Sequence, residues 1–264
     1  MKRRLDVRVA ELGHSREHAQ RLIMAGLVQV DGRRMDKPGT TISDDARVEV
    51  LRPLHPYVGR GGLKLERALD EWHMDVSDKV ALDMGASTGG FTHCMLLRGA
   101  RKVYAVDVGY GQLDYRLRQD TRVVSIERLN AREMTAEHVP ELVDIATIDV
   151  SFISLRLVLP PVLERIRPGG DCVALVKPQF EAGRGQVGRG GVVRDPAVHR
   201  AVLERFVSES PWPVHGLTRS PIEGATGNVE FLAWLRREAP AGEMALAIPD
   251  LVRGRQETLA EGGE

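Results

Sequence analysis

The chain has little cysteine and no long apolar run. Its two cysteines, Cys94 and Cys172, stand in apolar segments without the spacing of a disulfide framework or a metal site. We therefore expect two buried thiols, a reducing compartment and no bound metal. No stretch is long enough to span a membrane, and the opening MKRRLD is not followed by an apolar signal segment. These absences predict a soluble, cytoplasmic protein, and they leave its oligomeric state open.

The chain also lacks an excess of either charge. Lys and Arg together number 37 and so do Asp and Glu, which argues against a uniformly basic coat for nucleic acid. Basic residues are nevertheless dense in the first 50 residues. A length of 264 residues leaves room for one large domain and a small one.

Residues 1–50 have the pattern of a small α+β unit. Two short helical patterns come first, the second with Ser15 as a plausible N-cap and Gly26 as its stop. The segment LVQVDGRRM then alternates like a strand pair joined at an Asp31-Gly32 turn. From composition alone, these basic residues are expected to form a solvent-exposed face.

The order of these residues resembles an S4 RNA-binding domain. The marks of the resemblance are the segment RLDVRVAELGHSREHAQRLIMAGLVQVDG and the later KPG. It implies binding to structured RNA through phosphate contacts, which position a protein without distinguishing sequence. The arginines that it assigns to RNA in this unit are Arg3, Arg4, Arg16, Arg21 and Arg33.

The rest of the chain divides by composition into three parts. Residues 51–58 carry two prolines and predict a linker. Residues 59–238 form the large domain, which opens on a helix over 60–72. Residues 239–264 are rich in Gly, Glu and Ala and predict a weakly ordered tail, although its segment MALAIPDLV is apolar enough to dock.

Apolar strand patterns and helical patterns alternate along the large domain. This alternation predicts a Rossmann-like α/β fold with a mostly parallel, seven-stranded sheet covered on both faces. The last strand is expected to be antiparallel, an arrangement that fits a class I methyltransferase sheet better than a nicotinamide-binding one. Strands are expected over 80–84, 103–108, 123–127, 142–150, 172–178, 214–220 and 229–235. Helices are expected over 91–98, 112–118, 135–139, 155–166 and 196–208.

A glycine-rich turn follows the first of these strands, in ALDMGASTGGFT. Glycines permit close backbone approach to a ligand, and the helix that follows offers free N–H groups. Asp107 ends the next strand, where an acidic side chain suits a ribose diol. The turn predicts an adenosine-containing cofactor, and its candidate contacts are Asp83, Gly85, Ala86, Ser87, Thr88, Gly89, Gly90, Phe91, Asp107, Asn130 and Asp149.

Three interpretations of this turn compete. A dinucleotide-binding turn needs a glycine where Ser87 stands, because the pyrophosphate approaches there. S-adenosylmethionine has no pyrophosphate, so the turn favours that cofactor, with Asp83 facing its amino group directly or through water. A cofactor-free domain is the third interpretation. Two of the candidates also have structural explanations: Asn130 as a helix cap, and Phe91 as a core residue.

Four polar residues stand where strand ends converge on the crevice of an open sheet. Asp149 and Lys177 end strands, Glu230 opens the last strand, and Lys64 lies on the helix before the first. A lone lysine or glutamate is more often a surface charge. The apolar strand and the proline that flank Lys177 argue against that explanation here.

Six segments together resemble the TlyA family, in which an S4 domain precedes an FtsJ-like methyltransferase domain. They are YVGRGGLKLERAL, LDMGASTGGFT, TIDVSFISL, LVKPQFE, VGRGGVVRDP and TGNVEFL. The resemblance implies 2'-O methylation of cytidine in ribosomal RNA or ribosomal subunits from S-adenosylmethionine. It also implies a catalytic tetrad of Lys64, Asp149, Lys177 and Glu230.

Several questions stay open at this point. Lys177 accepts the hydroxyl proton or holds the oxygen as a cation. The loop over 181–194 resembles a mobile, RNA-facing segment in which Arg184, Arg189 and Arg194 meet phosphates. His93 and Gly59 depart from the Asp and Ser usual in the family. A non-catalytic RNA-binding factor and a cytolysin, since relatives carry the name hemolysin, are the competing functions.

Overall fold

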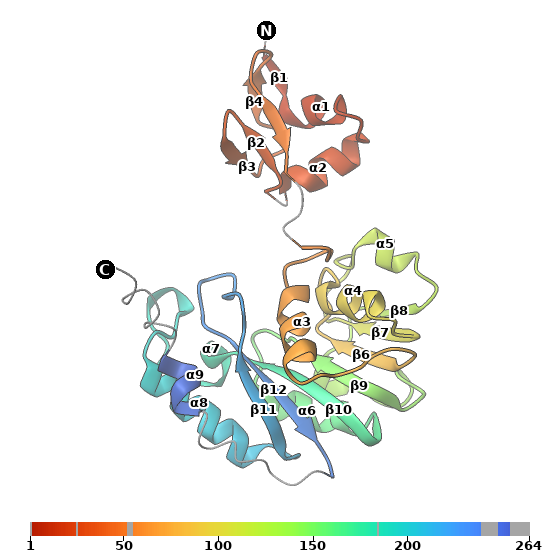
Figure 1. Ribbon diagram of the computed structural model, residues 1–264, viewed down its shortest axis with the longest axis vertical. Coiled ribbons are helices and arrows are strands. Elements are labelled where there is room, and N and C mark those ends of the chain that lie inside the picture. Colours follow the sequence, from red (N-terminus) through yellow and green to blue (C-terminus); the bar gives the residue numbers. More distant parts are fainter. Residues whose placement is uncertain (1, 25, 52–54, 184, 239–247, 254–264) are drawn as a thin grey trace, which may run out of the picture. The chain divides into compact units, whose positions relative to one another are not determined.

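Contacts in the computed structural model divide the chain into two units, Met1–Pro56 and Tyr57–Glu264 (Figure 1). The structure describes residues 2–24, 26–51, 55–183, 185–238 and 248–253.

The first unit is a small α+β domain with an apolar centre. Strand β1 pairs with β4, and β2 lies between β3 and β5, all antiparallel. The core is formed by Leu5, Val9, Ala19, Ile23 and Val28. The elements are β1 (Lys2–Arg4), α1 (Leu5–Ala10), α2 (Arg16–Met24), β2 (Val28–Val30), β3 (Arg33–Met35), β4 (Thr41–Ser43) and β5 (Val48–Val50).

Local signals in this unit act as predicted. The Ser15 hydroxyl accepts the His18 N–H at 3.2 Å and caps α2. Beyond α2, Gly26 takes a left-handed φ of 66°. Asp31 and Gly32 both have positive φ, which matches the twist of the β2–β3 hairpin.

The second unit is built on the predicted seven-stranded sheet. Its order is β11-β12-β10-β9-β6-β7-β8, and β12 runs antiparallel to both of its neighbours. The pairs that join β10, β9, β6, β7 and β8 are parallel, so these strands end at one edge of the sheet. The strands are β6 (Val80–Met84), β7 (Lys102–Val106), β8 (Val123–Ile126), β9 (Val143–Ile148), β10 (Ile166–Val176), β11 (Val214–Arg219) and β12 (Phe231–Arg236).

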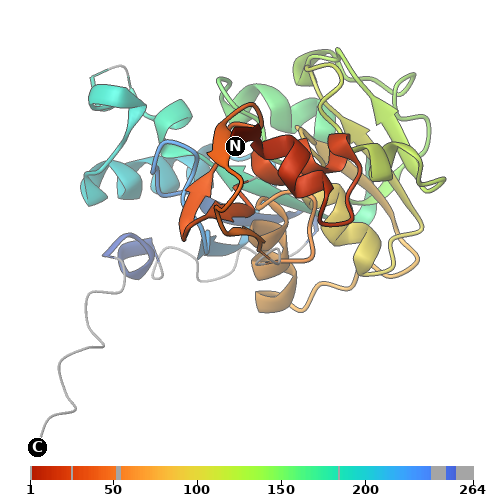
Figure 2. The same ribbon diagram turned by 90° about the horizontal axis from the view of Figure 1, so that it is seen from above.

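Helices cover both faces of this sheet (Figures 1 and 2). Alternate strand residues explain the two layers: Ala81 packs in the cluster that holds α3, α4 and α5, whereas Leu82 packs with α6, α8 and α9. The first layer contains α3 (Gly62–Glu71), α4 (Gly90–Leu97) and α5 (Tyr115–Arg118). The second contains α6 (Leu155–Leu163), α8 (Pro196–Glu209) and α9 (Ile248–Arg253), with α7 (Pro178–Glu181) against α8, and η1 (Ala131–Glu133) against α6.

Some predicted elements are wrong or shorter. No helix forms over 135–139: a single turn from Thr135 ends before Pro140, and the short η1 precedes it. Helix α5 begins only at Tyr115, because Asp114 caps it through the Arg116 N–H. Helix α6 ends at Leu163, since the chain already pairs with β9 from Ile166.

The C-terminal segment also differs from its prediction where the structure describes it. Residues 248–253 form α9 rather than weakly ordered chain, and Ile248 is buried against α8 and β11. This outcome matches the docking alternative for that apolar segment. The rest of the predicted tail, 239–247 and 254–264, lies outside the described residues.

Candidate active site

The glycine-rich loop joins β6 to α4 at the edge where the parallel strands end. Gly85 has a φ of 87°, and a Cβ there would lie 2.4 Å from the Asp149 carbonyl oxygen. Only glycine permits this close approach, which brings the end of β9 against the loop. Gly89, at φ 94°, precedes the first residue of α4, and Ser87 is also left-handed at 48°. The loop is therefore a strained, tightly specified turn.

Asp107 binds this loop from the end of β7. Its carboxylate accepts the Ser87 N–H at 2.8 Å and the Gly109 N–H at 2.6 Å. A shallow hollow opens between the loop and the ends of β7 and β8. Its lining residues are Ala86, Ser87, Ala105, Asp107, Gly109, Gln112, Leu113, Ser125 and Glu127.

Asp83 lies behind the loop rather than in the hollow. Its side chain is fully buried, and it accepts bonds from the Thr92 N–H and hydroxyl at 2.8 and 2.6 Å and from the Thr147 hydroxyl at 3.2 Å. These bonds brace α4 against β6, and the contact of Asp83 with a cofactor amino group, direct or through water, stays a prediction. Burial raises the pKa of Asp83 to about 7, although the threonine hydrogen bonds oppose the shift.

The raised pKa of Asp83 predicts a pH-dependent stability. Because the folded state holds the proton more tightly than the unfolded chain, this contribution is complete below about pH 4 and is lost as pH rises through about 7. Relative to Asp83→Asn, the wild type should lose stability on the order of 1 kcal/mol per pH unit between pH 5 and 7. Urea unfolding of both proteins at pH 5, 6 and 7 measures the difference. A difference that stays constant would contradict the buried, protonating carboxyl.

A glycine turn before α3 explains how Lys64 reaches this edge. A Cβ on Gly90 would lie 2.9 Å from the Gly62 nitrogen, and one on Gly62 would lie 2.3 Å from the Tyr57 ring. The starts of α3 and α4 therefore touch through backbone alone. This contact places Lys64, in the first turn of α3, beside the glycine loop.

The two residues that depart from the family pattern, Gly59 and His93, lie where the turn before α3 meets the start of α4. A Cβ on Gly59 would lie 2.6 Å from the Thr88 hydroxyl oxygen, so a serine there requires Thr88 to rotate. His93 accepts the Val58 N–H through Nδ1 at 3.1 Å. Burial lowers the pKa of His93, which favours the neutral ring that this bond needs. In this chain His93 therefore fastens the turn to α4.

The four polar residues predicted to converge do converge, as a chain of alternating charge. Glu230 Oε2 lies 2.6 Å from Lys64 Nζ, Lys64 Nζ lies 3.9 Å from Asp149 Oδ2, and Asp149 Oδ1 lies 2.6 Å from Lys177 Nζ. The Glu230 side chain is 4% exposed and both lysines are 9% exposed, whereas Asp149 is 20% exposed. The cluster is therefore formally neutral and nearly desolvated, with Asp149 as its most accessible member.

A further hydrogen bond holds Lys177 in place, and Glu181 fixes the helix that follows it. Its Nζ donates to the Ser151 hydroxyl at 2.9 Å. The short helix α7 that follows is held by Glu181, which accepts from the Leu155 N–H and the Ser154 hydroxyl, both at 2.7 Å. Burial raises the pKa of Glu181. This carboxyl thus ties α7 to the start of α6.

No sequence motif singled out Phe152, which follows Ser151, the hydrogen-bond partner of Lys177. The Phe152 side chain is 90% exposed and its φ is 64°, an unusual conformation for an aromatic residue. Its ring centroid lies 5.0 Å from that of Phe180. The motif TIDVSFISL places Phe152 three residues beyond Asp149, and that position was the available signal.

Phe91 and Asn130 match their structural explanations. Phe91 is 3% exposed and packs in the core beneath the loop. Asn130 caps η1, because its side-chain oxygen accepts the Arg132 N–H at 3.1 Å.

Two of the predicted RNA-binding arginines meet on one buried carboxylate. Asp6 is fully buried and accepts from Arg4 through two bonds of 3.0 Å, from Arg16 at 3.3 Å and from Gln20 at 3.0 Å. Hydrogen bonding from Arg4 holds the pKa of Asp6 well below its usual range. The Arg4 and Arg16 side chains remain 51% and 60% exposed, so Asp6 orients two guanidinium groups that still face solvent.

The other predicted arginines are more dispersed. Arg3 pairs with Glu11 and Asp44 at 2.7 and 2.9 Å, and Arg33 and Arg189 are exposed. Arg184 and the Arg21 side chain lie outside what the structure describes.

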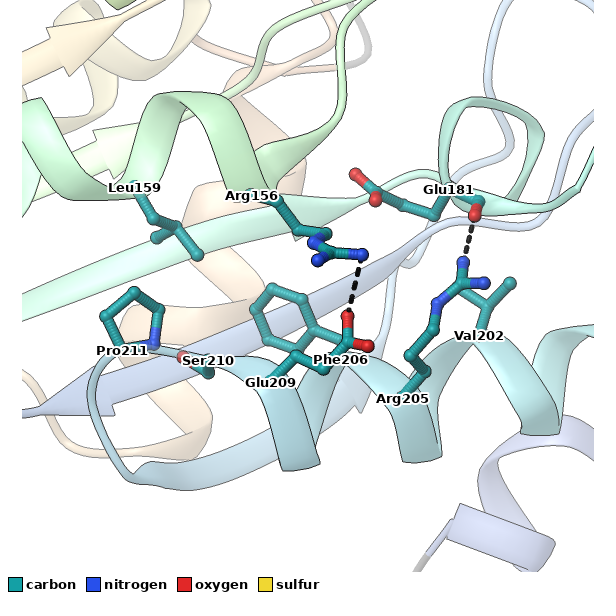
Figure 3. A pocket seen from close by; sticks show the side chains of 9 residues that line it. All are labelled: Arg156, Leu159, Glu181, Val202, Arg205, Phe206, Glu209, Ser210 and Pro211. Atoms are coloured by element: carbon teal, nitrogen blue, oxygen red, sulfur yellow. Dashed lines mark hydrogen bonds and ion pairs between the residues drawn. The ribbon is translucent and has the colours of Figure 1, made fainter.

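A second hollow lies away from these residues, between α6, α7 and α8 (Figure 3). Arg156 pairs with Glu209 at 3.1 Å across it, and Arg205 donates to the Glu181 carbonyl. Its floor is apolar, with Leu159, Val202 and Phe206. The rim charges are thus held by each other or by backbone, and the polar group left over in the lining is the Ser210 hydroxyl, which is buried without a hydrogen-bond partner among the described residues.

Comparison with known proteins agrees with this geometry. Residues 57–237 match the FtsJ-like methyltransferase family, and residues 3–48 match the S4 domain. The 16S/23S rRNA (cytidine-2'-O)-methyltransferase TlyA of Mycobacterium tuberculosis is 46% identical over 245 residues, which cover 91% of each chain. The chain belongs to the TlyA family.

Other members of the TlyA family carry a different name. Hemolysin A of Brachyspira hyodysenteriae is 43% identical over 236 residues, covering 87% of this chain and 98% of that protein. A solved structure from Streptococcus thermophilus, also named a hemolysin, has a TM-score of 0.75 and 46% identity over 96% of this chain and 94% of its own. Among the described helices, none combines the length and hydropathy needed to cross a bilayer.

Proposed function

We propose that this protein transfers a methyl group from S-adenosylmethionine to the ribose 2'-oxygen of a cytidine in ribosomal RNA. The observation that carries the proposal is the buried chain Glu230–Lys64–Asp149–Lys177 at the strand ends beside the glycine loop. A purely RNA-binding protein has no need of two desolvated lysine–carboxylate pairs, because burying charge costs free energy that only function or specificity repays.

The residues around the hollow fit an adenosine-containing cofactor. The start of α4 at Gly90 offers N–H groups, and the Asp107 carboxylate, anchored by the Ser87 N–H, suits a ribose diol. Asp83 braces α4. When bound, S-adenosylmethionine supplies a methyl group on a sulfonium, which is electrophilic without further activation.

The protein's own residues would position the acceptor oxygen. A lysine ammonium has three N–H donors, and Lys177 directs two of them to Asp149 and Ser151. The third is left for the ribose 2'-oxygen, which favours Lys177 as an orienting cation over a neutral base. Asp149, the most exposed member, is the neighbouring acceptor for the hydroxyl proton. Lys64 and Glu230 hold Asp149, and much of the rate would come from alignment.

The substrate follows from the first unit and from the relatives. The S4 domain presents Arg4 and Arg16, oriented by Asp6, to phosphates. The exposed ring of Phe152 offers a stacking face for a base beside the ion cluster. Relatives named for methylation of rRNA cytidine favour ribosomal subunits as the substrate, and this substrate would place the protein in the cytoplasm.

Mapping the product tests the proposal directly. Ribosomal subunits from cells that lack this protein are incubated with it and with S-adenosylmethionine carrying a tritiated methyl group. The RNA is then digested to nucleosides and separated by mass. We expect the label in 2'-O-methylcytidine. Label in a base, or in protein, would overturn the assignment of a ribose acceptor, and no incorporation would overturn methyl transfer to these subunits.

A further inference from the structure

The basic glycine-rich segment, here residues 185–194, is firmly anchored at its C-terminal end. Val192 and Val193 are 7% and 2% exposed, whereas Arg189 and Arg194 on either side of them are exposed. Within the segment, the Gly188 N–H donates to the Val192 carbonyl at 3.1 Å, which closes a compact turn. Buried valines between exposed arginines fix where the two positive charges emerge.

Asn228 supplies the anchor. It is 1% exposed, and its side-chain oxygen accepts the Val193 N–H at 2.9 Å. Its amide nitrogen donates to the Gly191 carbonyl and to the Thr226 hydroxyl, each at 2.9 Å. One acceptor and one donor position of the amide thus hold a segment 35 to 37 residues away in sequence, and the second donor bonds within the turn that carries Asn228.

A buried histidine completes this anchor. His199, on α8, is 3% exposed and its Nε2 lies 3.1 Å from the Val193 carbonyl oxygen. Its ring meets the Phe231 ring edge-on at 5.7 Å between centroids. Val193 is therefore held through both its N–H and its carbonyl.

The same short segment also supports the ion cluster. Glu230 follows Asn228 by two residues, and the Gly224 N–H donates to the Asn228 carbonyl at 2.9 Å. A Cβ on Gly224 would lie 2.6 Å from Glu230 Oε1, so this turn packs directly against the catalytic carboxylate. The basic segment and Glu230 therefore share one rigid support.

We propose that Asn228 is a positioning residue for the RNA substrate. It holds Arg189 and Arg194 at a set place relative to Glu230, so that phosphates next to the target ribose bind there and bring the 2'-oxygen to the ion cluster. Phosphate contacts fix the register of a nucleic acid, and alignment of the acceptor governs the rate. This inference rests on the proposed function and adds a way in which the RNA is aligned.

The test is steady-state methylation of ribosomal subunits by Asn228→Ala. We expect about a tenfold rise in KM for RNA, a kcat within about twofold, and an unchanged Kd for S-adenosylmethionine by calorimetry. The matched control is Asp75→Ala, which removes another side chain that accepts a backbone N–H at 2.8 Å, in the turn before β6. This control should leave all three values unchanged.

A double-mutant cycle separates positioning from simple support. If Asn228 acts through the arginines, Asn228→Ala should change little in an Arg189→Ala, Arg194→Ala background. Additive effects, or a fall in kcat with KM unchanged, would show that Asn228 serves only Glu230 and would overturn the inference. Where Asn228→Ala does not fold, Asn228→Asp replaces it, since it keeps the acceptor for Val193 but loses the donors to Gly191 and Thr226.

Failure of the proposed function is visible in the same experiment. If the wild type transfers no methyl group to subunits, the proposed function falls. The role of Asn228 is then judged by subunit-binding affinity alone. Equal affinity of the wild type and Asn228→Ala, beside weaker binding by the arginine double variant, would overturn it.

Discussion

Replacement of Lys177 by alanine is expected to abolish methyl transfer while cofactor binding remains. Lys177 lies 2.6 Å from Asp149 and 2.9 Å from the Ser151 hydroxyl, and in the proposed mechanism its third N–H binds the acceptor oxygen. It lines neither the glycine loop nor the hollow by Asp107. Loss of such a preorganised donor should lower kcat by about a thousandfold. A tritiated-methyl assay on ribosomal subunits measures turnover, and calorimetry measures the affinity for S-adenosylmethionine.

A paired surface lysine serves as the control for this result. Lys102 lies 2.8 Å from Glu141 in an exposed ion pair on β7. Lys102→Ala removes the same charge from the same unit and should leave turnover within about twofold. Near-wild-type turnover by Lys177→Ala would refute its role in positioning the acceptor. Loss of cofactor affinity in that variant would instead place Lys177 in cofactor binding.

Replacement of Glu230 by alanine is expected to cost both stability and activity. It leaves Lys64 buried, with Asp149 at 3.9 Å as its remaining partner. Removal of one member of a buried pair costs about 3–5 kcal/mol of the free energy of unfolding, because the other charge stays desolvated. Tryptophan fluorescence during urea unfolding reports on this unit alone, since the tryptophans are Trp72, Trp212 and Trp234.

A double variant distinguishes the two roles of this pair. Lys64→Met with Glu230→Gln removes both charges and should recover most of the lost stability without restoring methyl transfer. The control is Glu204→Ala, which breaks the exposed Arg200–Glu204 pair of 2.7 Å and should cost less than about 1 kcal/mol. Methyl transfer by the double variant would remove Lys64 and Glu230 from the proposed mechanism.

The predictions that held rest on local signals. Strand and helix periodicity, the Ser15 cap and the Asp31-Gly32 turn each depend on neighbours a few residues away, so they could be identified without coordinates. The prediction that was wrong also rested on a local signal. The helix expected over 135–139 had one turn's worth of hydrogen bonds before Pro140, too little to propagate.

Asp83 shows where such inference stops. Its place at a strand end before a glycine turn is the place of a cofactor contact, and nothing nearby in sequence says which way it points. The structure buries it against Thr92 and Thr147, the latter 64 residues away. Phe152 is the converse case, an aromatic residue that no sequence pattern singled out and that the fold leaves 90% exposed.

The sequence by itself determined the α/β architecture, the S4 unit, the glycine loop and the four polar positions at strand ends. Those features follow from periodicity and from backbone needs that few residue types satisfy. Only the tertiary structure decided which charges pair: Lys64 and Glu230 are 166 residues apart and meet at 2.6 Å because α3 packs against β12, which Glu230 directly precedes. The bond between Asn228 and Val193, which are 35 residues apart, is likewise set by the packing of the folded chain. Pairing energies depend on distance and burial, and both are properties of the packed chain.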